Sequence, residues 1–153
     1  MGEPSNETAG EETAGDHAVD DEAVDEAIRE AGLRVTRQRR AIFRALSGAE
    51  DHPDAEELHA RARALDPSLS LATVYRTLAA LSAKGMINRL DFEGAAARFE
   101  TADAPHHDHI VDLDSGQIVE FVSPEIEALQ RRIAEAHGYE IVSHRLELYC
   151  RRR

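Results

Sequence analysis

The chain has 153 residues, of which 42% are apolar and 31% are charged, as is ordinary for a globular protein that folds in water. Cys150 is its only cysteine, which excludes an intrachain disulfide and a zinc site made of cysteines, and favours the reducing cytoplasm. No apolar run is long enough to span a membrane, and the N-terminus lacks the layout of a signal peptide, so we expect no membrane partner.

The charge of the chain is unevenly distributed. Residues 1–30 hold eleven acidic residues against one arginine, a balance of −10, so the rest of the chain carries only −2 of the total of −12. Residues 1–19 have almost no large apolar side chains and are predicted to be a disordered acidic tail, for which a solubilising role is favoured over mimicry of DNA. Residues 33–47 hold five arginines and no acid, a local basic patch that suits DNA.

The first half of the chain is predicted to form four helices and a β-hairpin. Apolar residues recur at helical spacing in four segments, 20–31, 37–46, 55–65 and 71–84. Leu65 is expected to face inward at the end of the third helix. Two segments with strand character, 86–90 and 97–100, flank a turn. Helices followed by a hairpin are typical of a winged helix-turn-helix, so residues 20–101 are predicted to bind DNA.

The fourth predicted helix has a polar face near its start. Ala72, Thr73, Tyr75 and Arg76 lie off its apolar stripe. Small, hydroxylated, aromatic and guanidinium groups together suit the major groove of DNA. The alternative is a partly exposed helix face that packs on the hairpin.

The second half of the chain is predicted to be a separate small α/β unit, residues 106–153, joined through a hinge at 102–105. Strands are expected at 107–113 and 117–122, followed by a helix that Gly138 ends and by a last strand over 139–150. The helix has an apolar stripe of Ile126, Leu129 and Ile133, and the last strand places four residues on one face, Val142, His144, Leu146 and Leu148. An open sheet edge favours pairing with a second copy.

A cluster of metal-type ligands opens this second unit at residues 106–109. Successive side chains of a strand point to opposite faces, so His107 and His109 share one face while His106 and Asp108 share the other. Imidazole with carboxylate suits Zn, Fe(II), Mn or Ni. Two interpretations are open on this stretch alone: a metal site, or a solvated polar strand end.

Four stretches together resemble the ferric uptake regulator (Fur) family of metal-dependent repressors. They are Ala31 to Thr36 with Arg39, Leu71 to Leu78, Phe92 to Glu100, and His106 to His109 with Val119 to Phe121. The resemblance covers residues 22 to 150 in the order of the family. It implies an α/β (α+β) chain with an N-terminal winged helix-turn-helix and a small α/β dimerisation domain.

The resemblance also implies ligands and DNA contacts. A sensory site between the two units maps onto His52, Glu100, His107 and His109. A second site inside the dimerisation unit maps onto His106, Asp108, Glu127 and His144. The implied DNA contacts are Arg34, Arg37, Arg39, Thr73, Tyr75 and Arg76. His137 is expected to cap its helix rather than bind metal, and His17 and His59 are expected at the surface.

The chain departs from the family at one structural site. Many members hold a zinc ion with two Cys-x-x-Cys pairs, but the positions of the first pair are Asp112 and Ser115 here, and the C-terminal end offers only Cys150. A four-cysteine structural zinc is therefore excluded.

The leading functional hypothesis is a cytoplasmic homodimer, or a tetramer, that represses iron-uptake genes. With Fe(II) bound it would recognise double-stranded DNA at a palindromic, A·T-rich operator. Regulation by Mn(II), Zn(II) or peroxide is the alternative within the same class, with Mn(II) the runner-up. A metal-dependent hydrolase and a metal store are the alternatives from other classes; enzymatic activity is not expected, since no general base or nucleophile stands near the cluster.

Overall fold

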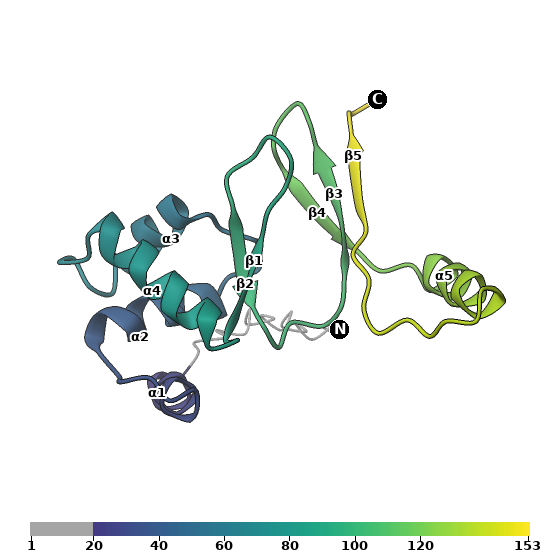
Figure 1. The fold of residues 1–153 in the computed structure, drawn as a ribbon. Helices are drawn as coiled ribbons and strands as arrows, with labels where there is room; N and C mark the ends of the chain where they lie inside the picture. The colour runs from purple at the N-terminus through teal and green to yellow at the C-terminus, as the bar shows by residue number, and fades with distance from the viewer. Residues whose placement is uncertain (1–19) are drawn as a thin grey trace, which may run out of the picture.

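In the part of the chain that the structure describes, two small sheets lie side by side, with four helices on one side of them and one on the other (Figure 1). The computed structural model describes residues 20–153. The predicted acidic tail, residues 1–19, and His17 lie outside the described residues. In chain order the elements are α1 (Asp21–Glu30), α2 (Arg37–Ser47), α3 (Ala55–Ala62), α4 (Leu71–Ala83), β1 (Ile87–Leu90), β2 (Arg98–Thr101), β3 (Asp108–Asp112), β4 (Ile118–Phe121), α5 (Pro124–Ala136) and β5 (Glu147–Cys150).

Each helix of the described chain begins at a side chain that accepts a hydrogen bond from a backbone N–H of the first turn. These N-cap residues are Asp20, Thr36, Asp54, Ser70 and Ser123. In α3 the arrangement is reciprocal, because the side chain of Glu57 also accepts a hydrogen bond from the Asp54 amide at 2.9 Å. Such caps satisfy donors that the helix itself leaves unpaired.

The cap of α4 gives a direct test of how much these bonds contribute. Ser70→Ala removes the oxygen that accepts from the Thr73 amide at 3.2 Å. We expect the free energy of unfolding to fall by about 1 kcal/mol, measured by urea denaturation. Ser82→Ala, near the other end of α4, is the control and should change it little; an equal loss in both variants would contradict the role of the cap.

The helical part has one apolar core, formed by the stripes predicted from helical spacing. It contains Val24, Ile28, Ile42, Leu46, Leu58, Val74, Leu78 and Leu81, and it takes in Ile87 and Phe99 from the hairpin. The hairpin of β1 and β2 is antiparallel and pairs Ile87 with Thr101. We call β1, β2 and the loop 91–97 the wing; Ile87 and Phe99 pack it against the helices.

The prediction that Leu65 faces inward was wrong. The third helix ends at Ala62, and Leu65 is 41% exposed. The chain leaves the helix in a turn, in which the Asp66 amide donates to the Ala62 carbonyl. The buried Asp66 carboxylate then accepts hydrogen bonds from the amide and hydroxyl of Ser68. Asp66 therefore takes the buried position that the helical period assigned to Leu65.

The second sheet has the strand order β4-β3-β5, with β3 antiparallel to β4 and parallel to β5. The long last strand predicted over 139–150 was wrong in its extent, because β-pairing begins only at Glu147. Residues 139–146 bridge the distance between α5 and the sheet instead (Figure 1). Val142, predicted on the apolar strand face, is 98% exposed.

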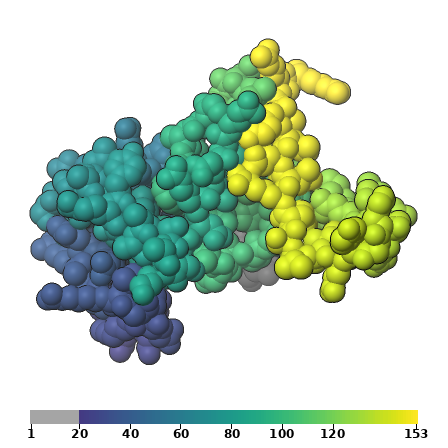
Figure 2. Space-filling model, viewed as in Figure 1, coloured from purple at the N-terminus to yellow at the C-terminus, as the bar shows by residue number. Residues whose placement is uncertain are grey.

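Helix α5 stands clear of its own sheet (Figures 1 and 2). It has no buried residue, and Leu129 and Ile133 of its predicted stripe are both about half exposed. Its apolar face thus has no partner among the described residues of the protomer. No helix of residues 20–153 has the length and apolar character needed to cross a membrane.

Candidate metal centres and nucleic-acid interface

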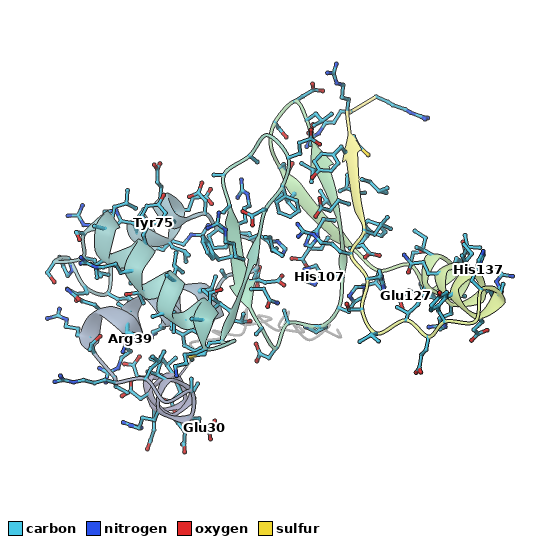
Figure 3. The ribbon with its side chains drawn as sticks, viewed as in Figure 1. Glu30, Arg39, Tyr75, His107, Glu127 and His137 are labelled. Atoms are coloured by element: carbon cyan, nitrogen blue, oxygen red, sulfur yellow. The ribbon has the colours of Figure 1, made fainter. Side chains whose placement is uncertain are left out.

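Four of the predicted ligands meet between the wing and the second sheet. His52 comes from the loop between α2 and α3, and Glu100 comes from β2. His107 immediately precedes β3 and His109 lies in it. One potential ligand atom from each lies within 4.8 Å of all the others. We call this group the hinge cluster; Figure 3 shows His107 between the two sheets.

The ligand atoms of the hinge cluster converge on one point. His52 Nε2 lies 3.0 Å from Glu100 Oε2, 3.1 Å from His107 Nε2 and 3.4 Å from His109 Nε2. Tetrahedral Zn–N bonds of about 2.1 Å place ligand atoms about 3.4 Å apart, and octahedral bonds of the same length place them about 3.0 Å apart. The spacing fits a first-row metal ion in either geometry, so selectivity depends on affinity and availability.

Two partners outside the cluster orient its imidazoles. The Pro105 carbonyl can only accept, so His107 Nδ1 donates to it at 2.7 Å and leaves Nε2 with its lone pair. His52 Nδ1 lies 3.2 Å from Glu120 Oε1 and is oriented in the same way. Partners of this kind fix the tautomer that a metal needs.

Glu120 is the residue of this site that the ligand assignment from sequence did not include. It reaches the cluster because the hairpin register pairs Glu120 with His109. Glu120 lies in the stretch Val119 to Phe121 that carries the resemblance, and the register of the predicted hairpin was the signal that could have placed it beside His109.

The electrostatics of the hinge cluster favour a cation. Burial acts to raise the pKa of Glu100, but the contacts of its carboxylate with His52 and Asn88 outweigh burial and hold that pKa below its ordinary value. Burial lowers the pKa of His109, and the neighbouring His52 and His107 lower it further. The site thus presents an ionised carboxylate and a neutral imidazole, the forms in which both groups bind metal.

A second cluster, His106, Asp108 and His144, lies on the other side of β3 and is called the sheet cluster. His106 Nε2 is 3.0 Å from His144 Nε2, and both are 3.5 Å from Asp108 Oδ1. Asp108 Oδ1 is buried without a hydrogen-bond partner, and a buried carboxylate oxygen needs a proton, a donor or a cation. The residues present therefore fit a metal ion.

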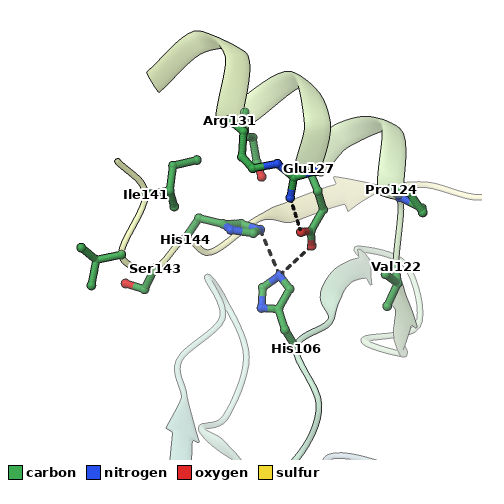
Figure 4. A pocket seen from close by; sticks show the side chains of 10 residues that line it. His106, Val122, Pro124, Glu127, Arg131, Ile141, Ser143 and His144 are labelled. Atoms are coloured by element: carbon green, nitrogen blue, oxygen red, sulfur yellow. Dashed lines mark hydrogen bonds and ion pairs between the residues drawn. The ribbon is translucent and has the colours of Figure 1, made fainter. Parts of the chain in front are cut away.

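Glu127 faces the sheet cluster from α5 (Figure 4). Its Oε1 is 3.4 Å from His106 Nε2, while Oε2 pairs with Arg131 at 3.9 Å. All four residues assigned to the second site are thus brought together. The side chains that strand alternation separated, His107 and His109 from His106 and Asp108, do belong to two different clusters.

The remaining described histidines have structural contacts. His137 caps α5, as expected, with Nδ1 2.8 Å from the Ile133 carbonyl. His59 was predicted at the surface, and this was wrong: it is half-buried, and its Nε2 lies 2.9 Å from the Leu69 carbonyl. The loop that follows α3 folds back over His59, which a helical period alone does not indicate.

The polar face predicted for α4 is exposed at the start of that helix. Tyr75 is 54% exposed and Arg76 is also exposed, while Val74 and Leu78 are buried. Tyr75 lies on the helical part of the molecule, well away from His107 (Figure 3). The Arg76 guanidinium donates to Thr73 Oγ1 at 3.2 Å, so these two side chains are already linked.

The arginine patch of 33–47 is partly neutralised by α1. Arg40 forms two hydrogen bonds with Asp25, at 2.6 and 2.5 Å, and Arg44 bonds Asp21 at 2.7 Å. The pKa of Asp25 is lowered, mainly by the Arg40 hydrogen bond. The three remaining arginines, Arg34, Arg37 and Arg39, are those assigned to DNA. Arg37 is 72% exposed in its side chain although it lies 3.7 Å from Asp66, and Arg39 bonds the Arg34 carbonyl.

Comparisons with known proteins agree on one family. The sequence model of the Ferric uptake regulator family matches residues 30–149. Ferric uptake regulation proteins of Brucella abortus (strain 9-941) and Rhizobium leguminosarum bv. viciae are 54% and 52% identical to the chain. These matches cover 82% and 78% of this chain, and 89% and 84% of the relatives.

Solved structures of relatives share the fold. The Vibrio cholerae ferric uptake regulator matches with a TM-score of 0.76 at 38% identity, over 84% of this chain and 98% of that one. A zinc-bound manganese uptake regulator matches with a TM-score of 0.73 at 49% identity, over 85% and 98%. The predicted fold class, a winged helix-turn-helix followed by an α/β dimerisation domain, is confirmed. The chain belongs to the ferric uptake regulator family of metal-responsive transcription regulators.

Proposed function

We propose that the chain is a cytoplasmic, homodimeric repressor of iron-uptake genes that binds a palindromic, A·T-rich operator when Fe(II) occupies the hinge cluster. The observation behind this proposal is that the hinge cluster draws ligands from both units. His52 and Glu100 belong to the winged-helix unit, residues 20–101, whereas His107 and His109 belong to the unit that follows the hinge at 102–105. A metal ion held by both would favour one orientation of the two units over others.

The DNA contacts are proposed on the exposed start of α4 and on Arg34, Arg37 and Arg39, the arginines near α2 that form no ion pair with α1. Tyr75 would meet base edges or thymine methyls, and Arg76, with Thr73 beside it, a guanine or a phosphate. Arg34 would reach the minor groove or the backbone, while Arg37 and Arg39 contact phosphates. Arg40 and Arg44 form ion pairs with α1 and are not among the proposed contacts.

Regulation by manganese is the second candidate, and a specific finding favours it. A zinc-bound manganese uptake regulator is 49% identical to the chain, close to the identity of the ferric relatives. Ligands of the same type suit Fe(II), Mn(II) and Zn(II), so the sensed metal has to be measured.

The deciding experiment is an anaerobic titration of a labelled A·T-rich palindromic operator with Fe(II), Mn(II) and Zn(II) in parallel, at one fixed salt concentration. Tight binding induced by Fe(II) at a physiological free concentration supports the iron repressor, and the same result with Mn(II) alone supports the manganese regulator. If no metal changes the affinity for DNA, the proposed metal-dependent switch is wrong and the clusters are structural or storage sites.

The apolar face of α5 predicts the dimer contact. Leu129 and Ile133 are exposed on α5, and Val142 follows in the connection to β5. Ile133→Glu should place a charge in the interface and raise the dimer dissociation constant by at least about tenfold, measured by sedimentation equilibrium. Leu65→Glu makes the same change at an exposed leucine of the helical part and is the control. A dimer of unchanged affinity in Ile133→Glu would exclude this face from the interface.

A further inference from the structure

The loop of the wing has a buried phenylalanine. Phe92 lies in the loop between β1 and β2, yet it is only 4% exposed. Its neighbours in a small second core are Leu90 of the wing and Val111 of β3, with Ile118 and Tyr149 packed against them. The second sheet therefore covers the wing loop, and Figure 2 shows the teal wing against the yellow atoms of the C-terminal strand.

Polar groups around β5 hold the backbone on either side of Phe92. The Arg145 guanidinium donates to the Asp91 carbonyl at 3.0 Å, and the Glu93 amide donates to the Tyr149 hydroxyl at 3.0 Å. Tyr149 in turn donates to Glu147 Oε2 at 2.6 Å, and the other oxygen of Glu147 pairs with Arg145. The guanidinium carbon of Arg145 also lies 5.7 Å from the centre of the Phe92 ring.

Arg145, Glu147 and Tyr149 form one connected network of hydrogen bonds and an ion pair. Glu147 orients both Arg145 and Tyr149, and each of these binds one backbone group of the wing loop. The hydrogen bond to Glu147 raises the pKa of Tyr149, so its hydroxyl keeps the proton that it donates. We call Arg145, Glu147 and Tyr149 the wing latch.

The wing latch is adjacent to the hinge cluster. The Phe92 ring contacts the His109 ring edge to face, with 5.3 Å between their centres. In the sheet, His109 is the register partner of Glu147, and the His109 amide donates to the Leu146 carbonyl. The position of His109 and the position of the wing loop are therefore set by the same short segment of β5.

The wing transmits its position to the DNA-facing helix. Ile87 and Phe99 of the wing are buried in the core that contains Val74 and Leu78 of α4, and close-packed interiors have low compressibility and transmit strain. We infer that Arg145 and Tyr149 are positioning residues: they dock the wing loop on β5 and so set the orientation of α4 for the operator, in addition to the metal. This inference rests on the proposed function.

A measurement without DNA tests the docking itself. In the full-length protein, hydrogen exchange of the Glu93 amide should be slower than in an unstructured peptide, because the Tyr149 hydroxyl accepts from it. Tyr149→Phe keeps the ring in the small core but removes the acceptor, and should speed the exchange about fivefold, as expected for one ordinary hydrogen bond. Tyr139→Phe, at a tyrosine that is 73% exposed, is the matched control and should leave the rate unchanged.

A second measurement tests the consequence for DNA. With saturating metal, Tyr149→Phe and Arg145→Gln should each bind the operator about fivefold more weakly, while the metal content and the dimer dissociation constant stay those of the wild type. Unprotected Glu93 in the wild type, or unchanged operator affinity in both variants, would overturn the inference. If the wild type itself does not bind the operator with metal, the proposed function fails, and the Glu93 amide still decides whether the wing is docked.

Discussion

His107→Ala should abolish metal-dependent operator binding and leave the dimer intact. The imidazole of His107 is one of the converging ligands of the hinge cluster, and its Nε2 is 3.1 Å from both His52 Nε2 and Glu100 Oε2. Removing even an outer-shell partner costs metal sites 10- to 100-fold in affinity, so loss of a ligand should weaken metal binding by about 100-fold or more. The dimer contacts proposed on α5 include no residue of the hinge cluster, so the dimer should persist.

The measurement combines metal affinity, operator binding and sedimentation on the same preparation. His137→Ala is the matched control, because His137 caps α5 and belongs to neither cluster. The same loss of response is expected for His109→Ala, but that change also removes the ring that contacts Phe92, so His107 gives the cleaner result. Full metal-dependent binding by His107→Ala would exclude the hinge cluster as the switch.

Arg76→Ala should weaken operator binding more than binding to random DNA. Arg76 is exposed near the start of α4 and is steadied by its bond to Thr73. A guanidinium that reads a base edge contributes about 1–3 kcal/mol of discrimination, so we expect about a 5- to 150-fold loss of affinity for the operator. A phosphate contact would instead be lost equally on every sequence.

Parallel titrations of operator and random duplexes at one salt concentration distinguish these cases. Arg63→Ala, at an exposed arginine that follows α3, is the control and should not change the ratio of the two affinities. An equal loss on both duplexes in Arg76→Ala would remove Arg76 from base recognition and assign it to a phosphate.

The sequence by itself determined where most helices and strands form and which potential metal ligands lie on the same face of β3. Helical spacing depends on neighbours within one or two turns, so the starts of α2 at Arg37 and α4 at Leu71 follow from the sequence. The two-residue period of a strand places His107 and Asp108 on opposite faces, and these two residues belong to different clusters in the structure.

Only the tertiary structure decided which distant groups meet. Glu120 orients His52 through strand register, His59 is covered by a returning loop, and Asp25 neutralises Arg40 from another helix. β5 begins only at Glu147, because a strand forms only beside a partner strand, and the alternating residues 139–145 have no register partner in β3. Phe92 is the clearest example. In the sequence it lies in a predicted turn, and it is buried only because the second sheet packs on the wing.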